Sequence, residues 1–375
     1  MKNIMKSVVL LLFLVILLLQ PAPIITATKT GFITWVEKVI PSLFPFFVLT
    51  RLMIYYQVPQ LIGKLLAPLF KYLLHLSPIT FFVMFLSLIS GNPSGSKMAR
   101  DYYDQHLISL KEMEGLMYFC NFSSPLFIIG TVGVVLYQST RIGYLLLMVH
   151  LLGSLAVFIY CYPLLRSKES IRHVSIEFPT QSFSTILIDC IESSIQTLIR
   201  VGGIIVFFYI ISEALKIIHF TQLLDTLLLP LIHGFGLDST EPLIAGILEF
   251  TQGVTKVSQT EAPIQTKLVL TAFILSFTGL SVHTQSFMFA KNLNISYLKY
   301  LMMRLLHGCT SATILFFTWQ RVLKDEINVF SPIESTQLTT KSLLIPFMLG
   351  LLSLYFILKA YHSIKRRVLN QSTSY

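Results

Sequence analysis

The sequence predicts an all-α polytopic membrane protein with about eight to ten membrane elements, re-entrant hairpins among them. Three observations support this fold class. Hydrophobic residues make up 54% of the 375 positions and charged residues only 12%, whereas an average soluble domain carries roughly 25% charged residues. The apolar residues are gathered into blocks, as membrane spans require. Several blocks are interrupted by Gly, Pro, Asn and Ser, which is typical of helices that break inside a bilayer.

The N-terminal segment, residues 1–30, is predicted to be a membrane anchor. Lys2 and Lys6 precede an apolar run at 8–19, which fits either a signal peptide or a first span. The apolar stretch continues to residue 25, so we favour an uncleaved span. The lysines place its N-terminal end in the cytoplasm.

Residues 31–165 form the first of two predicted repeats. Pro41 and Pro45 interrupt the apolar run 31–56 and predict a bent or re-entrant element there. The segment 61–76 carries three basic residues and is expected at the membrane interface. The run 81–89 is too short to span and ends in a polar break at 90–97.

The same repeat continues with a second interrupted block. The apolar run 117–136 is broken at 120–125, and the run 142–165 is an uninterrupted span. Residues 166–181 are rich in Lys and Arg and are predicted to be a cytoplasmic loop.

Residues 182–320 form the second predicted repeat. Its apolar runs are broken at 249–253 and again at 278–285. Beyond it, residues 321–375 contain a polar loop, a last span at 343–358 and a basic tail. The tail, like the N-terminus, is predicted to be cytoplasmic.

The spacing of the breaks supports the repeat. Gly91 and Asn121 are 30 positions apart, and so are Gly253 and His283. Each half therefore has one Gly-containing break and another polar break one span later. Paired interrupted segments in two halves of a membrane protein indicate a transporter binding site. Loops at the membrane surface are the other interpretation of these breaks.

Polar residues of the breaks, together with two arginines inside apolar runs, are the predicted solute-binding residues. Half-helix N-termini at such breaks favour anions. The predicted set is Gly91, Asn92, Ser94, Gly95, Ser96, Lys97, Asn121, Ser123, Ser124, Arg51, Arg200, Glu249, Gln252, Ser281, His283 and Gln285.

Several of these residues have alternative interpretations. Arg51 and Arg200 could bind a carboxylate bidentately or extend their guanidinium groups to the interface. Glu249 could bind a cation, carry a proton, or neutralise Arg200 or Lys256. His283 could bind solute or join two helices by a hydrogen bond.

Other functional classes find little support in the sequence. HExxH, P-loop, GxGxxG and GxSxG motifs are absent, so we expect no enzyme and no cofactor. The four cysteines lack metal-site spacing. The net charge of +10 fits membrane topology and anionic headgroups better than nucleic acid. Secondary transport is the favoured class, with the lipid bilayer and a small anionic solute as partners.

Several motifs together resemble one family. They are the residues at 41–46, 90–97, 121–130, 194–198, 276–285 and 304–308. In combination they are similar to the YlbJ (SpoVV) family of sporulation integral membrane proteins, which is part of the nucleoside-recognition "gate" group. The resemblance covers roughly residues 30–320. It departs from the family pattern at Asn92, Ser96 and Thr278.

The resemblance implies two gate-like repeats, an architecture similar to that of concentrative nucleoside transporters. It also implies transport of dipicolinic acid, a planar aromatic dianion, across the outer forespore membrane during endospore formation, with charge supplied by Arg51 or Lys97. The alternatives are a carrier of nucleosides or another small polar solute, and a non-transporting sporulation scaffold. Assembly into a homo-oligomer stays open.

Overall fold

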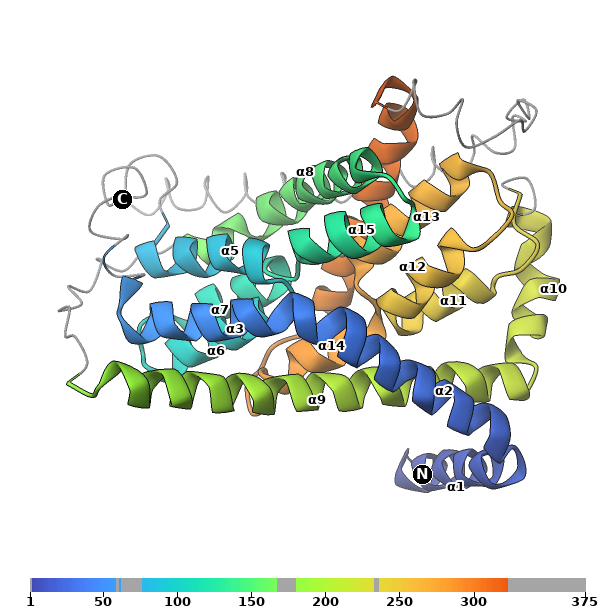
Figure 1. Ribbon diagram of the computed structural model, residues 1–375, viewed down its shortest axis with the longest axis horizontal. Coiled ribbons are helices and arrows are strands. Elements are labelled where there is room, and N and C mark those ends of the chain that lie inside the picture. The colour runs from blue at the N-terminus through green and yellow to red at the C-terminus, as the bar shows by residue number, and fades with distance from the viewer. Residues whose placement is uncertain (1, 59–60, 62–75, 167–179, 233–235, 323–375) are drawn as a thin grey trace, which may run out of the picture.

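A computed structural model describes residues 2–58, 61, 76–166, 180–232 and 236–322. In these residues, secondary structure is helical apart from one antiparallel bridge between Leu76 and Arg166 (Figure 1). The predicted all-α fold class is confirmed. The predictions for 61–76, 166–181 and 321–375 fall almost entirely outside the described residues.

The N-terminal part contains α1 (Lys2–Leu19), α2 (Pro21–Thr34), a π-helical turn η1 (Trp35–Val39) and α3 (Ile40–Tyr55). The chain bends by 99° between α1 and α2, where Pro21 starts the new helix. Helix continues from α2 through α3, so neither Pro41 nor Pro45 ends it, and the helix axis changes direction near η1 (Figure 1). The wider π turn directly before Pro41 makes room for the ring where an α-helix would clash.

The next elements are α5 (Pro78–Ser90), α6 (Ser94–Asp104), α7 (Leu110–Phe119), the π-helix η3 (Phe127–Leu136) and α8 (Thr140–Leu165). Serine side chains begin three of these helices by accepting a backbone N–H. Ser77 caps α5, and Ser139 caps α8. Ser109 forms a reciprocal capping box with Glu112 at the start of α7. Such caps satisfy amides that have no partner inside the helix.

The remaining helices are α9 (Phe183–Ile217), α10 (Phe220–Ile232), α11 (Glu241–Leu248), α12 (Phe250–Ser258), α13 (Ile264–Phe277), α14 (Gly279–Met288) and α15 (Tyr297–Val322). Their order matches that of the first half. A long helix is followed by a short hairpin, an interrupted helix and a long span in each half. The α5–α6 and α11–α12 hairpins enter the molecule from opposite ends (Figure 1).

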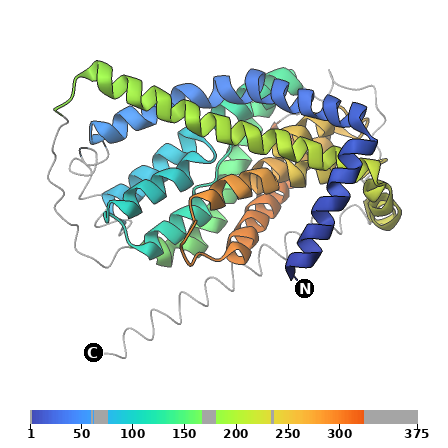
Figure 2. The same cartoon turned by 90° about the horizontal axis from the view of Figure 1, so that it is seen from below.

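Two long helical segments form one side of the molecule. The run α2–η1–α3 packs along α9, as both views show (Figures 1 and 2). The contact is close at Gly202, where an added Cβ would overlap the Trp35 ring. Behind these helices, α8, α13 and α15 pack together and enclose a second layer of buried apolar side chains.

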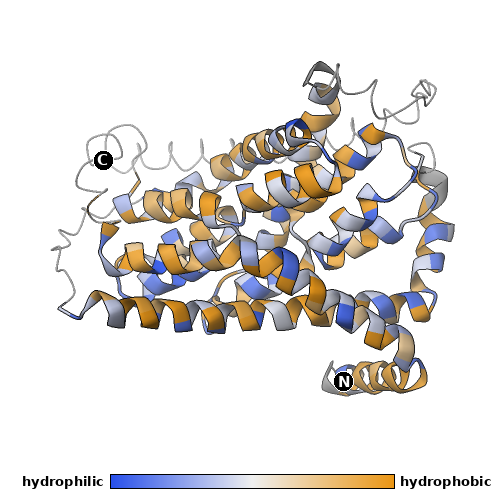
Figure 3. Ribbon diagram, in the orientation of Figure 1, coloured by the Kyte–Doolittle hydropathy of each residue, from blue (hydrophilic) through white to orange (hydrophobic). Residues whose placement is uncertain are grey.

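Hydropathy identifies the membrane-embedded elements. Four described helices are long and apolar enough to cross a membrane: Thr140–Leu165, Phe183–Ile217, Ile264–Met288 and Tyr297–Trp319. The bent α1–α2 pair would be a fifth. In Figure 3 apolar residues dominate α9 and α1, whereas α6 carries many hydrophilic ones. The short hairpin helix α6 therefore has a larger share of polar residues than the long helix α9.

Candidate functional site

Four interruptions of helix meet inside the bundle. The first is the turn between α5 and α6, where Gly91 has a positive φ of 76°. Ser94 starts α6, and its hydroxyl donates to the Gly91 carbonyl. Gly91 packs so tightly on Ser124 that a Cβ would overlap it. This turn therefore requires glycine for both its conformation and its packing.

The second interruption, residues 120–124, separates α7 from η3. Arg304 of α15 secures it, donating to the carbonyl oxygens of Asn121 (2.9 Å) and Tyr118. Ser123 Oγ donates to the Leu275 carbonyl across 2.9 Å. That bond joins the interrupted helix of the first half to the interrupted helix of the second half.

The other two interruptions are shorter than predicted. Glu249 alone separates α11 from α12, and Thr278 alone separates α13 from α14. The Glu249 side chain caps α12 by accepting the Gln252 N–H at 2.8 Å, so helix resumes at once. Thr278 ends α13 in the left-handed conformation, with φ 71°. The predicted breaks at 249–253 and 278–285 are therefore mostly helix.

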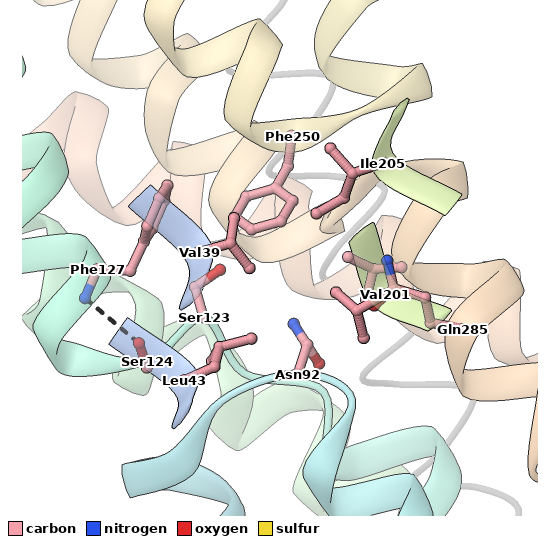
Figure 4. Close-up of a pocket in the computed structure, with 11 residues that line it drawn as sticks. Val39, Leu43, Asn92, Ser123, Ser124, Phe127, Val201, Ile205, Phe250 and Gln285 are labelled. Carbon is pink, nitrogen blue, oxygen red and sulfur yellow. Dashed lines mark hydrogen bonds between the residues drawn. The ribbon is translucent and has the colours of Figure 1, made fainter. Parts of the chain in front are cut away.

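A small cavity of about 30 Å³ lies where these interruptions meet (Figure 4). Its polar lining comes from the interruptions and from α14: Asn92, Ser123, Ser124 and Gln285. Its apolar walls come from η1, α3, α9, η3, α12 and α14: Val39, Leu43, Val201, Ile205, Phe127, Phe250 and Val282. The space accommodates about one or two water molecules, so it excludes larger solutes in this conformation.

Several buried polar atoms around the interruptions have no hydrogen-bond partner among the described residues. They are both side-chain amide atoms of Asn92, Ser96 Oγ, Glu249 Oε1, Gln252 Oε1 and Ser281 Oγ. Buried polar groups are normally paired with protein or water. Of these residues, Asn92 lines the central cavity, where a polar ligand or water can pair with its amide.

A second cavity, of about 150 Å³, lies between α3, α6, α9 and the end of α14. Three cations line it: Arg51, Lys97 and Arg200. Lys97 forms an ion pair with Asp101 at 2.9 Å. Neither arginine forms an ion pair with a carboxylate of the described chain. Ser193, Gln196 and Thr197 add polar groups to this basic pocket.

Some of the predicted solute-binding residues thus line the central cavity or the basic pocket. Three others, Gly95, Asn121 and His283, have structural contacts. Gly95 allows α6 to approach Cys120. Asn121 Oδ1 accepts hydrogen bonds from Ser286 (2.7 Å) and Tyr300 (3.2 Å). His283 Nε2 lies 2.9 Å from the Phe277 carbonyl, beside the Thr278 interruption. These residues position the interruptions, and their contact with solute stays a prediction.

Sequence reasoning missed a buried polar network on α8, α13 and α15. Arg304 and His307 are both 0% exposed. His307 Nε2 lies 2.8 Å from the His150 carbonyl, and His150 Nδ1 lies 2.8 Å from Ser276 Oγ. An arginine inside an apolar run is itself a signal of function or pairing. We applied this rule to Arg51 but not to Arg304. Applying it to Arg304 would have predicted this network.

Opposed hairpins, two interrupted helices and a polar centre define a membrane protein of gate type. Residues 36–154 match the family model described as nucleoside recognition, or Gate. The chain is 32% identical over 321 residues to the sporulation integral membrane protein YlbJ of Bacillus subtilis (strain 168). That match covers 80% of this chain and 79% of the relative. The chain therefore belongs to the YlbJ family of sporulation integral membrane proteins. No solved structure matches it.

Proposed function

We propose that the protein carries a small anionic solute, dipicolinate, across the outer forespore membrane during endospore formation. The observation that carries this proposal is the basic pocket beside the convergent interruptions. A membrane protein keeps several cations around one cavity only at a cost, so such groups are usually functional. The expected orientation, with both termini cytoplasmic, is part of the proposal.

The charge of the basic pocket suits a dicarboxylate. Arg51, Lys97 and Arg200 supply three positive charges, and Asp101 neutralises one of them. The remaining charge equals that of a dianion. Guanidinium groups bind carboxylates through two parallel hydrogen bonds. Neither arginine forms an ion pair with a described carboxylate, although Asp101 also attracts Arg51.

Movement between two states would complete the mechanism. The cavity at the four interruptions is too small for an aromatic dicarboxylate. Solute would pass from the basic pocket into that cavity once the hairpins separate, and hairpins entering from opposite ends suit alternating access. The protein would need neither a cofactor nor enzymatic chemistry for this step, and its partners would be the solute and the bilayer.

A nucleoside is the second candidate solute. The match of residues 36–154 to a nucleoside-recognition model favours it, as do the neutral amide and hydroxyl groups of Asn92, Ser123 and Gln285 at the central cavity. A non-transporting scaffold is less favoured, because a scaffold has no use for unpaired buried polar atoms.

Uptake into proteoliposomes tests the proposal. We expect dipicolinate to enter at a rate that excess nucleoside leaves unchanged. Arg51→Gln and Arg200→Gln should each lower uptake at least tenfold. Lys299→Gln, which removes an exposed cation paired with Glu114, should keep the normal rate. Nucleoside uptake with no dipicolinate uptake would support the second candidate instead.

Spores of a strain lacking the gene provide the cellular test. We expect little dipicolinate in the spores while the mother cells still make it. Normal spore content would exclude dipicolinate as the solute of this protein.

A further inference from the structure

Glu249 occupies an unusual position for a carboxylate. It is 0% exposed and stands alone between α11 and α12, at the tip of the hairpin. Oε2 accepts the Gln252 N–H at 2.8 Å and the Thr251 hydroxyl. Oε1 has no hydrogen-bond partner among the described residues. Oε2 of Glu249 therefore caps α12, and Oε1 has no hydrogen bond within the described chain.

No basic side chain neutralises this carboxylate. Lys256, on the same hairpin, binds Glu241 instead, and Arg200 lines the basic pocket. In the described chain, no Lys, Arg or His forms an ion pair with Glu249. The neighbouring groups are hydroxyls: Ser281 from α14 and Tyr209 from α9. A buried carboxylate without a counter-charge is costly unless a bound cation or proton neutralises it.

The atoms around Glu249 also point to a cation. Glu249 Oε1, Gln252 Oε1 and Ser281 Oγ make no hydrogen bond of ordinary length among the described residues, although the Ser281 hydroxyl is close enough to the Glu249 carboxylate to interact with it. A proton or a metal ion bound to the carboxylate would satisfy Glu249 Oε1. A carboxylate would also repel an anionic solute, so this place suits a partner of the opposite charge.

We propose that Glu249, Ser281 and Gln252 bind a monovalent cation, either a proton or Na⁺, that is transported together with the solute. The coupling of the cation to solute transport rests on the proposed function, whereas cation binding by Glu249 does not. The α14 N-terminus touches the hairpin tip, since a Cβ at Gly279 would lie 3.1 Å from the Phe250 nitrogen. Cation binding at this junction would hold the α11–α12 hairpin against α14 and so favour the conformation with the small central cavity.

Thermal unfolding of the full chain in detergent tests binding without any transport. A cation that binds only the folded protein raises the unfolding midpoint. If the cation is Na⁺, replacing choline by Na⁺ should raise the wild-type midpoint, and Glu249→Gln should abolish that rise. If it is a proton, lowering the pH should raise the wild-type midpoint relative to that of Glu249→Gln. Glu241→Gln, on the same hairpin, should behave as wild type in both comparisons. If Glu249→Gln changes neither response, the cation site is refuted.

Transport then tests coupling. In proteoliposomes, the wild type should accumulate dipicolinate above the external concentration when the matching cation gradient is applied. Glu249→Gln should reduce the accumulation ratio to about one while solute exchange across the membrane continues. Loss of exchange in a folded Glu249→Gln variant would mean that Glu249 contacts solute, which overturns the cation role. An absence of any wild-type transport would refute the proposed function and leave the binding result to stand by itself.

Discussion

Two asparagines at neighbouring interruptions have opposite environments. Asn121 is bonded on both sides of its amide: Oδ1 accepts from Ser286 and Tyr300, and Nδ2 donates to the Met117 carbonyl. Neither amide atom of Asn92 has a partner in the described chain, although the residue lines the central cavity. One asparagine therefore fixes the structure, and the other is available for solute.

This contrast predicts different effects of alanine substitution. Asn121→Ala should lower the free energy of unfolding by about 1–3 kcal/mol, because it removes three buried side-chain hydrogen bonds. Asn92→Ala should change it by less than about 1 kcal/mol, since no hydrogen bond is lost, yet should slow solute uptake. Denaturation and uptake measured on both variants check this. A larger stability loss for Asn92→Ala would contradict the assignment.

Arg304 holds the second interruption in place through two hydrogen bonds to backbone carbonyls. It is fully buried and donates to two carbonyl oxygens at the C-terminal end of α7, where the helix dipole favours a cation. Arg304→Gln should cost about 1.5–3 kcal/mol for each charge-assisted hydrogen bond that is lost. Lys299→Gln, which loses an exposed ion pair with Glu114, should cost about 1 kcal/mol or less. Similar losses measured by thermal unfolding would contradict a structural role for Arg304.

At the scale of elements, α9 packs on α2–η1 through the face that carries Gly202, and the adjacent Gly203 lies on an open face. An added Cβ at Gly202 would overlap the Trp35 ring, whereas a Cβ at the adjacent Gly203 would meet nothing within 4 Å. Gly202→Ala should therefore destabilise the protein by about 1–3 kcal/mol. Gly203→Ala should stabilise it by up to about 1 kcal/mol through helix propensity. Unfolding midpoints that shift equally in both variants would mean that α9 does not pack there as described.

At the scale of the whole molecule, opposed hairpins predict opposed loops. The loop after α6 and the loop after α12 lie at opposite ends of the structure (Figure 1), so they should face opposite sides of the membrane. Gln105 and Gln259 are exposed in these loops, and the four natural cysteines are buried. A membrane-impermeant maleimide should label only one of Gln105→Cys and Gln259→Cys in intact cells. Labelling of both, or of neither until lysis, would refute the inverted arrangement.

Patterns along the chain were enough to predict the helical membrane fold, the paired interruptions and the family. Hydrophobic blocks and Gly, Pro and Asn breaks are local features, and the bilayer converts them directly into helices and gaps. The same patterns did not decide between a bent helix and a re-entrant element at Pro41, because they do not show the π turn that accommodates the ring in a continuous helix. They also made the second-half breaks too long, since one capping carboxylate and one left-handed threonine are sufficient to interrupt a helix.

Contacts between distant segments decided the rest. Arg51, Lys97 and Arg200 are widely separated in sequence, and only the packing of α3, α6 and α9 brings them to one cavity. The sequence left four roles open for Glu249: binding a cation, carrying a proton, and neutralising Arg200 or Lys256. The tertiary structure excludes the last two, because Lys256 pairs with Glu241 and Arg200 lines the basic pocket. Charge and hydropathy are properties of residues, so the sequence determines them. Pairing and burial depend on which surfaces meet, and for this protein only the three-dimensional packing of the two halves determines that.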